Sequence, residues 1–400
     1  MLSYITRIVD KFFALITYNK SNFIYIFYLK MMDRFQDRGL YFLKQDSGYI
    51  IEFFNSSHII FRQKKMFKSL IGWGYNLLKT DWNLLWKSCQ SIKNKNTMFL
   101  FLDSIFSALL YETTPQEYFY FEFYNKNSNE RAKWAGQTAM WKAQRGYVKP
   151  NIIPSFSSKE KFSSIYRDLM IGQSYTFNLP EKLDDLISFI NKNKERDFFI
   201  KPENGQCGVG AFKLENNCNI SNRVKLLKDK LKNSTGKYII EPLITNHEVL
   251  RRVNPSSLNT VRIVTRLDDQ NNVEILFARV RFGVGKDVDN LGSGGLAAPV
   301  DPKTGKIIDE AVSTLNGKTT YVATHPLSAI VFKDYQLPNW NRVIQVVEKA
   351  ALIQPDAKII GWDIAITPED IYIIEGNHNW CKLLWQLPVK QGLKYQLEKF

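Results

Sequence analysis

Cysteine is scarce in this sequence, and its four residues are far apart: Cys89, Cys207, Cys218 and Cys381. None belongs to a Cys-x-x-Cys pair, so the sequence lacks the spacing that a disulfide framework or a structural zinc site requires. This usage is typical of proteins in a reducing compartment, and we expect a cytoplasmic location.

Long apolar runs are also absent. The run that comes closest, SNFIYIFYLKMM, is shorter than the ~20 residues that a membrane-spanning helix needs. Near the N-terminus, Arg7, Asp10 and Lys11 interrupt the apolar residues, and no Ala-x-Ala-like cleavage site follows. We therefore expect neither a signal peptide nor a membrane-spanning segment.

What the sequence does contain is an ordinary globular composition with an excess of positive charge. Apolar residues make up 44% and charged residues 23% of 400 residues, which suits two or three packed domains. The net charge is +15, and residues 1–150 carry +10 of it, from 21 Lys and Arg against 11 Asp and Glu. Such a basic region favours anionic partners: nucleic acid, acidic lipid headgroups or acidic glycans.

Two regions differ in their hydrophobic periodicity. Residues 1–150 are predicted to be mainly helical, because apolar residues recur at helical spacing in YITRIVDKFFALI. Thr114-Pro115 gives a helix-start signal, and SNERAKWAGQTAMWKAQRG is predicted to be one helix ending at Gly146. Beyond residue 150, β-rich runs alternate with helical ones, and turns such as DDQNN and TPED indicate antiparallel pairs. The sequence predicts an α+β fold after a helical, basic and aromatic-rich N-terminal domain, residues 1–150.

The first stretch that carries chemistry is FFIKPENGQCGVGAFKL. Lys201-Pro202 ends one predicted strand, and a loop with Gly205, Gly208 and Gly210 precedes the next. Glycines let successive N–H groups converge on phosphate oxygens. A Walker A loop or a Rossmann fingerprint would need a helix after the glycines, whereas a strand is predicted here. The loop is therefore either a phosphate-binding loop of another kind or an ordinary hairpin turn.

The stretch KYIIEPLITNHEVL offers a second candidate. Glu241 ends an apolar strand, Pro242 breaks it, and Glu248 follows. A strand end can present a carbonyl and an N–H to an adenine edge, and a nearby carboxylate can accept hydrogen bonds from ribose hydroxyls. The alternative is a strand and turn that carry surface acids.

Four arginines alternate with apolar residues on two predicted strands: Arg262, Arg266, Arg279 and Arg281. Residues two apart on a strand share a face, so these side chains form either a solvated basic face or a wall that binds phosphates or a carboxylate. The loop DVDNLGSGG follows, with Asn290, Gly294 and Gly295. It is either a flexible connection or an element that closes over a substrate.

The hairpin GWDIAITPEDIYIIEGNHNW places acids in two apolar strands. Asp363 lies in the first strand, Glu375 ends the second, and Asn377 follows. Their hard oxygen atoms suit Mg²⁺, which usually keeps waters and phosphate oxygens as its other ligands. Each residue alone could be an edge acid or a turn Asn, but the three together favour a metal site. Glu369 and Asp370 fall in the turn, so we exclude them as ligands.

Taken in order, these stretches resemble the ATP-grasp superfamily, and more narrowly its sugar-transfer-associated group from bacterial surface-polysaccharide loci. SLNTVRIVT, DNLGSGG, GWDIAI, IIEGN and the upstream TPQEYFYFEFY and ERAKW carry the narrower resemblance. It implies that ATP binds between two α+β subdomains: residues 151–245, with the glycine loop and adenine hinge, and residues 246–400, with the metal and substrate site. The implied ATP-binding residues are Lys161 (with Lys159 as a rival), Lys201, Gly205, Gly208, Gly210, Glu241, Leu243, Ile244 and Glu248.

The resemblance also implies a mechanism, in which a substrate carboxylate attacks the γ-phosphate of ATP and an amine then displaces phosphate. Arg281 would stabilise charge near the γ-phosphate, and Arg262 or Arg279 would hold the carboxylate. His378 would contact the substrate or deprotonate the amine. The implied ligands of two Mg²⁺ ions are Asp363, Glu375 and Asn377. The implied substrate-binding residues are Asn290, Gly294 and Gly295.

The expected function is therefore an ATP-dependent carboxylate–amine ligase that joins an amine to a uronic acid, or an amino acid to an amino sugar, in capsule or O-antigen synthesis. Residues 1–100 are expected to contact the inner face of the membrane or a lipid-linked glycan. A sugar kinase or a small peptide ligase on the same fold stays an alternative. A non-catalytic nucleic-acid-binding protein is another, but the basic residues form no arm and the hairpin acids would have no role, so we expect no nucleic acid partner.

Overall fold

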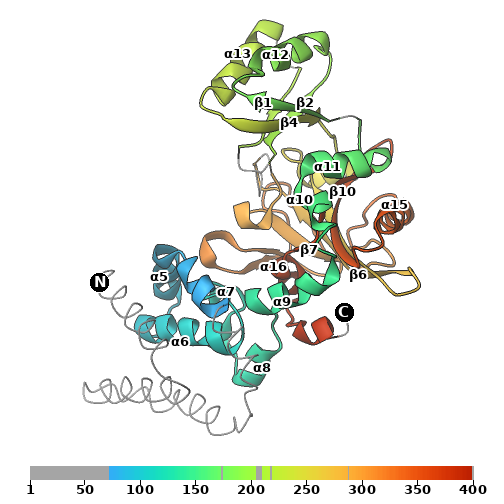
Figure 1. Cartoon of the computed structure of the whole chain (residues 1–400). Helices are drawn as coiled ribbons and strands as arrows, with labels where there is room; N and C mark the ends of the chain where they lie inside the picture. The colour runs from blue at the N-terminus through green and yellow to red at the C-terminus, as the bar shows by residue number, and fades with distance from the viewer. Residues whose placement is uncertain (1–71, 173, 204–209, 217–218, 287, 399–400) are drawn as a thin grey trace, which may run out of the picture. The chain divides into compact units, whose positions relative to one another are not determined.

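Figure 1 shows a computed structural model of the protein. The described residues are 72–172, 174–203, 210–216, 219–286 and 288–398. All of them belong to one compact unit. The helix predicted in YITRIVDKFFALI and two glycines of the predicted phosphate loop, Gly205 and Gly208, lie outside the described residues.

Short helices make up the described part of the N-terminal region, which confirms its helical class. Asp81 accepts hydrogen bonds from two N–H groups of α5, Asn96 caps α6, and Asn127 forms a capping box with Glu130 at α8. Across the described residues, no helix is long and apolar enough to cross a membrane. The N-terminal helices are α5 (Trp82–Ser91), α6 (Thr97–Leu110), α7 (Glu117–Tyr120), η1 (Phe123–Asn125), α8 (Ser128–Ala132) and α9 (Gln137–Tyr147), and α10 (Ile153–Ser157), α11 (Lys159–Ile165) and η2 (Arg167–Leu169) follow before the first strand.

The single helix predicted for SNERAKWAGQTAMWKAQRG is wrong, because this stretch forms α8 and α9 with a break before Gly136. A Cβ atom at Gly136 would lie only 2.4 Å from the carbonyl oxygen of Glu112 and 2.5 Å from the Cα of Thr113. Thr138 also donates its N–H to the Glu112 carbonyl at 2.9 Å. The chain leaves the first helix to pack its backbone closely against residues 112–113, and a continuous helix would prevent this contact.

A four-stranded antiparallel sheet comes next, with strand order β1-β4-β2-β3. Ile200 of β2 and Ile240 of β4 point into a core with Leu186 and Ile190 of α12 and Leu227 of α13. Figure 1 shows both helices on the same side of the sheet. The bounds are β1 (Tyr175–Leu179), α12 (Leu183–Lys192), β2 (Phe198–Pro202), β3 (Phe212–Leu214), α13 (Ile220–Leu231) and β4 (Gly236–Pro242).

The larger sheet has seven antiparallel strands in the order β11-β10-β5-β6-β7-β8-β9. The turns DDQNN and TPED join β5 to β6 and β10 to β11, which confirms both predicted hairpins. The strands are β5 (Thr260–Leu267), β6 (Val273–Phe282), β7 (Leu296–Val300), β8 (Ala311–Ser313), β9 (Thr320–Val322), β10 (Ile359–Ile366) and β11 (Ile371–Asn377). The helices around them are α14 (Glu248–Val253), η3 (Leu291–Ser293), η4 (Leu315–Gly317), α15 (Trp340–Ile353), α16 (Lys382–Gln386), η5 (Leu387–Val389) and η6 (Lys394–Glu398).

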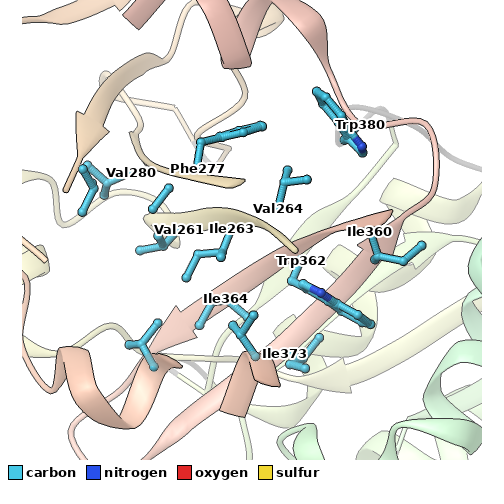
Figure 2. Packing of buried hydrophobic residues seen from close by; sticks show 14 of the residues in the cluster. Val261, Ile263, Val264, Phe277, Val280, Ile360, Trp362, Ile364, Ile373 and Trp380 are labelled. Carbon is cyan, nitrogen blue, oxygen red and sulfur yellow. The ribbon is translucent and has the colours of Figure 1, made fainter. Parts of the chain in front are cut away.

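The two faces of the larger sheet differ in chemistry. On one face, Ile263, Trp362, Ile364 and Ile373 lie side by side (Figure 2), and α15 packs against these strands. Every residue of β10 is buried, including those that point the other way. Because side chains alternate along a strand, Asp363 points to the opposite face. The apolar core therefore holds in place the strands that carry the charged residues.

The predicted domain boundaries both fall between elements of this fold. Residue 150 lies between α9 and α10, and residue 245 lies between β4 and α14. The division into domains 1–150, 151–245 and 246–400 stays a prediction.

Candidate functional site

A row of charged side chains crosses four neighbouring strands of the larger sheet. Strand register places Asp363 of β10 opposite both Glu375 of β11 and Arg262 of β5. Arg262 forms a two-pronged ion pair with Asp363, in which Nε donates to Oδ1 and Nη2 donates to Oδ2 at 2.8 Å. Arg281 of β6 reaches the same carboxylate, with Nη2 at 3.0 Å from Oδ2. Asp363 is therefore a buried carboxylate held between two buried guanidinium groups.

Glu375 ends this row with a second carboxyl group as its neighbour. It is half-buried, shares a hydrogen bond with Asp363, and accepts one from Asn377 Nδ2 at 3.0 Å. Burial raises the pKa of Glu375, and the negative charge of Asp363 raises it further. Burial would also raise the pKa of Asp363, but Arg262 and Arg281 hold it well below its usual range. The structure thus brings the three predicted metal ligands side by side.

These three residues suit a hard divalent cation. A cation beside Glu375 would relieve the repulsion between the two adjacent carboxyl groups, which adds to the effect of burial in raising the pKa of Glu375. Within the described residues, no cluster of three or more His, Cys, Asp or Glu could hold a metal ion by itself. Mg²⁺ fits such a partial set, because it usually takes water and phosphate oxygens as its remaining ligands. Asp370, excluded above, lies in the turn and pairs with Arg342 at 2.9 Å.

Arg279 has different surroundings, although it is the cross-strand partner of Arg262. Its Nη1 and Nη2 each donate at 2.8 Å to a carbonyl, those of Ala278 and of Trp385 in α16. The guanidinium lies 5.0 Å from the centre of the Phe277 ring. Burial lowers the pKa of Arg279 to about 9. These contacts favour an anchoring role under α16 over the predicted contact with a substrate carboxylate.

The loop between β6 and β7 brings two further residues to Arg281. Asn290 Oδ1 accepts a hydrogen bond from Arg281 Nη1 at 3.1 Å. Asp289, which the sequence analysis did not single out, accepts from the N–H of Thr260 at 2.8 Å and from its hydroxyl at 2.6 Å. The signal available in the sequence was the Asp-Asn pair shortly after a predicted strand rich in arginine.

Three of the predicted glycines can be located, and each has a backbone reason to be glycine. Gly294 has φ of +92°, and a Cβ atom at Gly295 would lie 2.3 Å from the carbonyl oxygen of Asp289. In the predicted phosphate loop, Gly210 has φ of +75° and stands close to Pro202, where a Cβ atom would be 3.1 Å from Cγ. The first two glycines thus shape the loop around Asp289.

Lysines from two elements meet near the end of β2. Lys201 Nζ lies 2.6 Å from Glu241 Oε2. Lys159, the first residue of α11, donates from Nζ to the carbonyl of Glu203. Burial lowers the pKa of Lys159, and the positive charge of Lys201 lowers it further, so the two ammonium groups are close enough to repel each other. Lys161, the better match in the sequence, is exposed. The structure therefore groups Lys159, and not Lys161, with Lys201.

A shallow recess adjoins the end of β4 and the strand β11. It is lined by Met170, Ile171, Gly172, Ser174, Glu241, Ile244, Ile373 and Ile374. Mainly apolar walls beside a strand end suit a flat aromatic ring with polar edges. Leu243, next to the recess, donates its N–H to Asp197 at 2.9 Å. Glu248 starts α14, is exposed, and pairs with Arg252 at 2.6 Å.

The segment after β11 connects this site to the helical region. His378 is half-buried, and burial lowers its pKa, which favours the neutral imidazole that can accept a proton. Lys382 begins α16, and its Nζ lies 2.7 Å from Oε1 of the buried Glu117. Gln386, fully buried, exchanges hydrogen bonds of 2.8 and 3.0 Å with the backbone of Ala135. The helical residues around 117–135 therefore belong to the same packed structure as the site.

Comparisons with known proteins address this part of the chain. A family model described as "Sugar-transfer associated ATP-grasp" matches residues 143–400, which include both sheets and every candidate site residue. The solved D-alanyl-alanine synthetase A from Vibrio cholerae O1 is similar, with 11% identity over 61% of this chain and 62% of that chain, at a TM-score of 0.37. The D-alanine–D-alanine ligase from Helicobacter pylori is 14% identical over 63% of this chain and 64% of that chain, at a TM-score of 0.38. The L-amino acid ligase from Bacillus licheniformis is 13% identical over 56% of this chain and 41% of that chain, at a TM-score of 0.34. This chain spans less than two thirds of each of these proteins. A search of curated proteins finds no match.

Proposed function

Because the chain belongs to the sugar-transfer-associated ATP-grasp family, we propose that it is an ATP-dependent ligase that joins a carboxylate to an amine. The observation that carries the proposal is the buried row of Glu375, Asp363, Arg262 and Arg281. Acids for a cation and arginines for anionic oxygens are the two kinds of group that phosphoryl transfer needs. The lysine pair and the apolar recess beside β4 supply candidates for the rest of an ATP site.

In this proposal, adenine occupies the recess against Ile244, with the backbone of residues 241–244 at its polar edge. Lys201 and Lys159 neutralise the α- and β-phosphates, and Gly210 is the described glycine of the predicted phosphate loop. We prefer Lys159 to Lys161 because Lys159 is already close to Lys201. Glu248 accepts hydrogen bonds from the ribose hydroxyls. To do so, its carboxylate must give up its ion pair with Arg252 when the nucleotide binds.

The chemistry proceeds in two displacements. An oxygen of the substrate carboxylate forms a bond to the γ-phosphorus, the bond to the β–γ bridging oxygen breaks, and ADP leaves with that electron pair. The amine nitrogen then attacks the acyl carbon, the carbon–oxygen bond breaks, and phosphate leaves. Arg281 stabilises the charge on the transferring phosphoryl oxygens. His378, neutral by virtue of its burial, accepts the proton that the amine loses.

Mg²⁺ would be held by Glu375, Asp363 and Asn377, and it would supply charge neutralisation of the phosphate oxygens. The residues themselves contribute a fixed orientation, because Asp363 is locked between two arginines and Asn377 is bonded to Glu375. Arg262 therefore acts on the phosphates through Asp363, and does not hold the substrate carboxylate, a role that the resemblance implied for Arg262 or Arg279.

For the substrates, we propose a uronic acid with an amine, or an amino acid with an amino sugar, in capsule or O-antigen synthesis. The family description, with its association with sugar transfer, supports this choice. The +10 charge of residues 1–150 supports a cytoplasmic protein that meets an acidic membrane surface or a lipid-linked glycan.

The test is an ADP-release screen of uronic acids and amino acids against amine acceptors, with mass detection of the product. An amide together with ADP and phosphate is expected, whereas a phosphorylated acceptor would identify a kinase. Glu375→Gln is expected to abolish ATP turnover, and unchanged turnover would refute the metal assignment.

The two lysines provide a matched pair of variants on one helix. Lys159→Met is expected to weaken ATP binding by about tenfold or more, because it removes a partly buried cation beside the phosphates. Lys161→Met should change ATP binding by less than about twofold, as expected for an exposed charge. Isothermal titration with ATP measures both, and the reverse ranking would restore Lys161 as the first phosphate lysine.

A further inference from the structure

Asp289 is a buried carboxylate to which the proposed reaction gives no role. It lies just before η3, and only 6% of its surface is exposed. Its Oδ2 accepts from the N–H and the hydroxyl of Thr260 and lies 3.6 Å from Arg281 Nε. An acid is retained in a protein interior only when its partners compensate the loss of hydration, so these contacts account for the burial of Asp289.

Arg281 is surrounded by acceptors on every side. Its Nη2 lies 3.0 Å from Asp363 Oδ2, and its Nη1 donates to Asn290 Oδ1 at 3.1 Å. Its Nε and Nη2 donate to the hydroxyl oxygen of Thr260 at 2.9 and 2.5 Å. That hydroxyl in turn donates a hydrogen bond to Asp289 Oδ2. The guanidinium is therefore fixed between two carboxylates, one on the metal side and one on the loop side.

The two carboxylates pull Arg281 in opposite directions. Without Asp289, the guanidinium would turn fully toward Asp363, which is already paired with Arg262. In that orientation the positive charge of Arg281 would be directed at Asp363, and less of it would be available to a third negative group. With Asp289 present, the orientation of Arg281 is set before any phosphate arrives.

We propose that Asp289 is a positioning residue that holds Arg281 in the orientation needed to meet the γ-phosphate. Asn290 supports the same orientation through its side-chain oxygen. The inference rests on the proposed function, since it takes Arg281 as the group that meets the γ-phosphate. It also assigns the DNLGSGG loop a fixed supporting role, in place of the closing element considered from sequence.

The backbone of this loop is built for such a role. Gly295 passes so close to Asp289 that a Cβ atom would be 2.3 Å from its carbonyl oxygen. The N–H of Gly295 donates to the carbonyl of Asn290 at 3.0 Å, and that of Gly294 donates to Leu291 at 3.2 Å. The loop thus closes on itself around the two residues that contact Arg281.

The experiment uses the full chain and two probes that differ by one phosphate: ADP, and the non-hydrolysable triphosphate AMP-PNP, each with Mg²⁺. Asp289→Asn keeps an acceptor for Thr260 but removes the charge beside Arg281. Titration calorimetry is expected to show AMP-PNP affinity falling by about tenfold and ADP affinity changing by less than about twofold. Asp309→Asn is the matched control, because Asp309 is half-exposed and pairs with Lys390; neither affinity should change.

The outcomes separate this inference from the proposed function. If Asp289→Asn lowered the affinity for both nucleotides equally, or for neither, the positioning role would be refuted. The proposed ATP site would be unaffected by either result. Failure of the unaltered protein to bind either nucleotide would remove the proposed function and this inference with it. If circular dichroism finds Asp289→Asn unfolded, Asn290→Ala removes one of the same contacts from a less buried position, and the same selective loss for AMP-PNP is then required.

Discussion

The ion pair between Glu117 and Lys382 predicts how strongly the helical region is attached to the structure that carries the larger sheet. The two charged atoms are 2.7 Å apart, and the side chains are only 3% and 14% exposed. Glu117 also accepts from the N–H groups of Thr114 and Gln137, at 2.9 and 3.0 Å. Gln137 is the first residue of α9, so a negative charge at this point is favoured by the helix terminus as well.

Glu117→Gln keeps the shape of the side chain and leaves Lys382 without its counter-charge. The amide oxygen can still accept from one or both N–H groups, so the main loss is the charge pair. At an effective dielectric constant near 20, two unit charges at this distance attract by about 6 kcal/mol. Lys382 still donates to Gln137 Oε1 at 2.6 Å, which offsets part of that loss. We therefore expect the free energy of unfolding to fall by about 3 kcal/mol, the lower end for breaking a buried pair.

Urea unfolding followed by tryptophan fluorescence measures this change. The double variant Glu117→Gln with Lys382→Met should be less destabilised than the sum of the single variants, by about 1.5 kcal/mol or more. Asp356→Asn is the control, because Asp356 and Lys149 form a pair whose side chains are 48% and 65% exposed, and its loss should cost less than about 0.5 kcal/mol. If Glu117→Gln were no more harmful than Asp356→Asn, the helical region would not depend on this pair and the argument for its attachment would fail.

Two further predictions concern pH and membranes. Burial would raise the pKa of Glu112, but Lys394 and Lys142 hold it at about 2, so its contribution to stability should be complete above about pH 4.5 and vanish as the pH falls toward 2. Glu112→Gln should therefore lower the free energy of unfolding by up to about 3 kcal/mol at pH 7 and by progressively less in acid. Urea unfolding measures this difference, and a difference that does not shrink between pH 7 and pH 3 would contradict the prediction. For the basic N-terminal region, the full chain should pellet with phosphatidylglycerol vesicles and not with phosphatidylcholine vesicles, and high salt should release it. Equal pelleting with both lipids would count against the membrane proposal.

The sequence was sufficient to predict the strands that carry the site, but it could not decide between two candidate residues that lie close together in the chain. Asp363 and Glu375 were conspicuous because an ionisable group in an apolar strand needs a reason, and strand register brings them together. Lys159 and Lys161 could not be separated in this way. Two residues apart on a helix, they point in nearly opposite directions, and only the packing of α11 decides which one faces Lys201.

The arginines illustrate the opposite limit. Arg279 and Arg281 lie two apart on one strand, so periodicity assigns them the same face. Their roles diverge because α16 covers Arg279 and offers it a carbonyl, whereas the loop after β6 offers Arg281 an acid and an amide. The α16 carbonyl that contacts Arg279 belongs to a helix far away in the sequence, and the acid and amide that contact Arg281 belong to an irregular loop. Hydrophobic periodicity predicts neither kind of contact. Asp289 was missed for this reason, since a loop acid is by default a surface acid.

Two glycines of the β10–β11 hairpin, Gly361 and Gly376, allow other parts of the chain to pack closely against its two faces. A Cβ atom at Gly361 would lie 2.8 Å from Trp380 Cβ and 3.2 Å from Arg262 Cδ, so its absence lets the Arg262 stem lie flat against β10 on the charged face. A Cβ atom at Gly376, between Glu375 and Asn377, would lie 2.9 Å from the ring of Phe162 in α11. Because α11 begins with Lys159, this close approach brings that lysine within electrostatic reach of Glu375. Each face of the hairpin therefore has one glycine that allows a close approach: Arg262 packs at Gly361, and α11, which begins with Lys159, packs at Gly376. Both approaches place a cationic side chain near the acids of the hairpin.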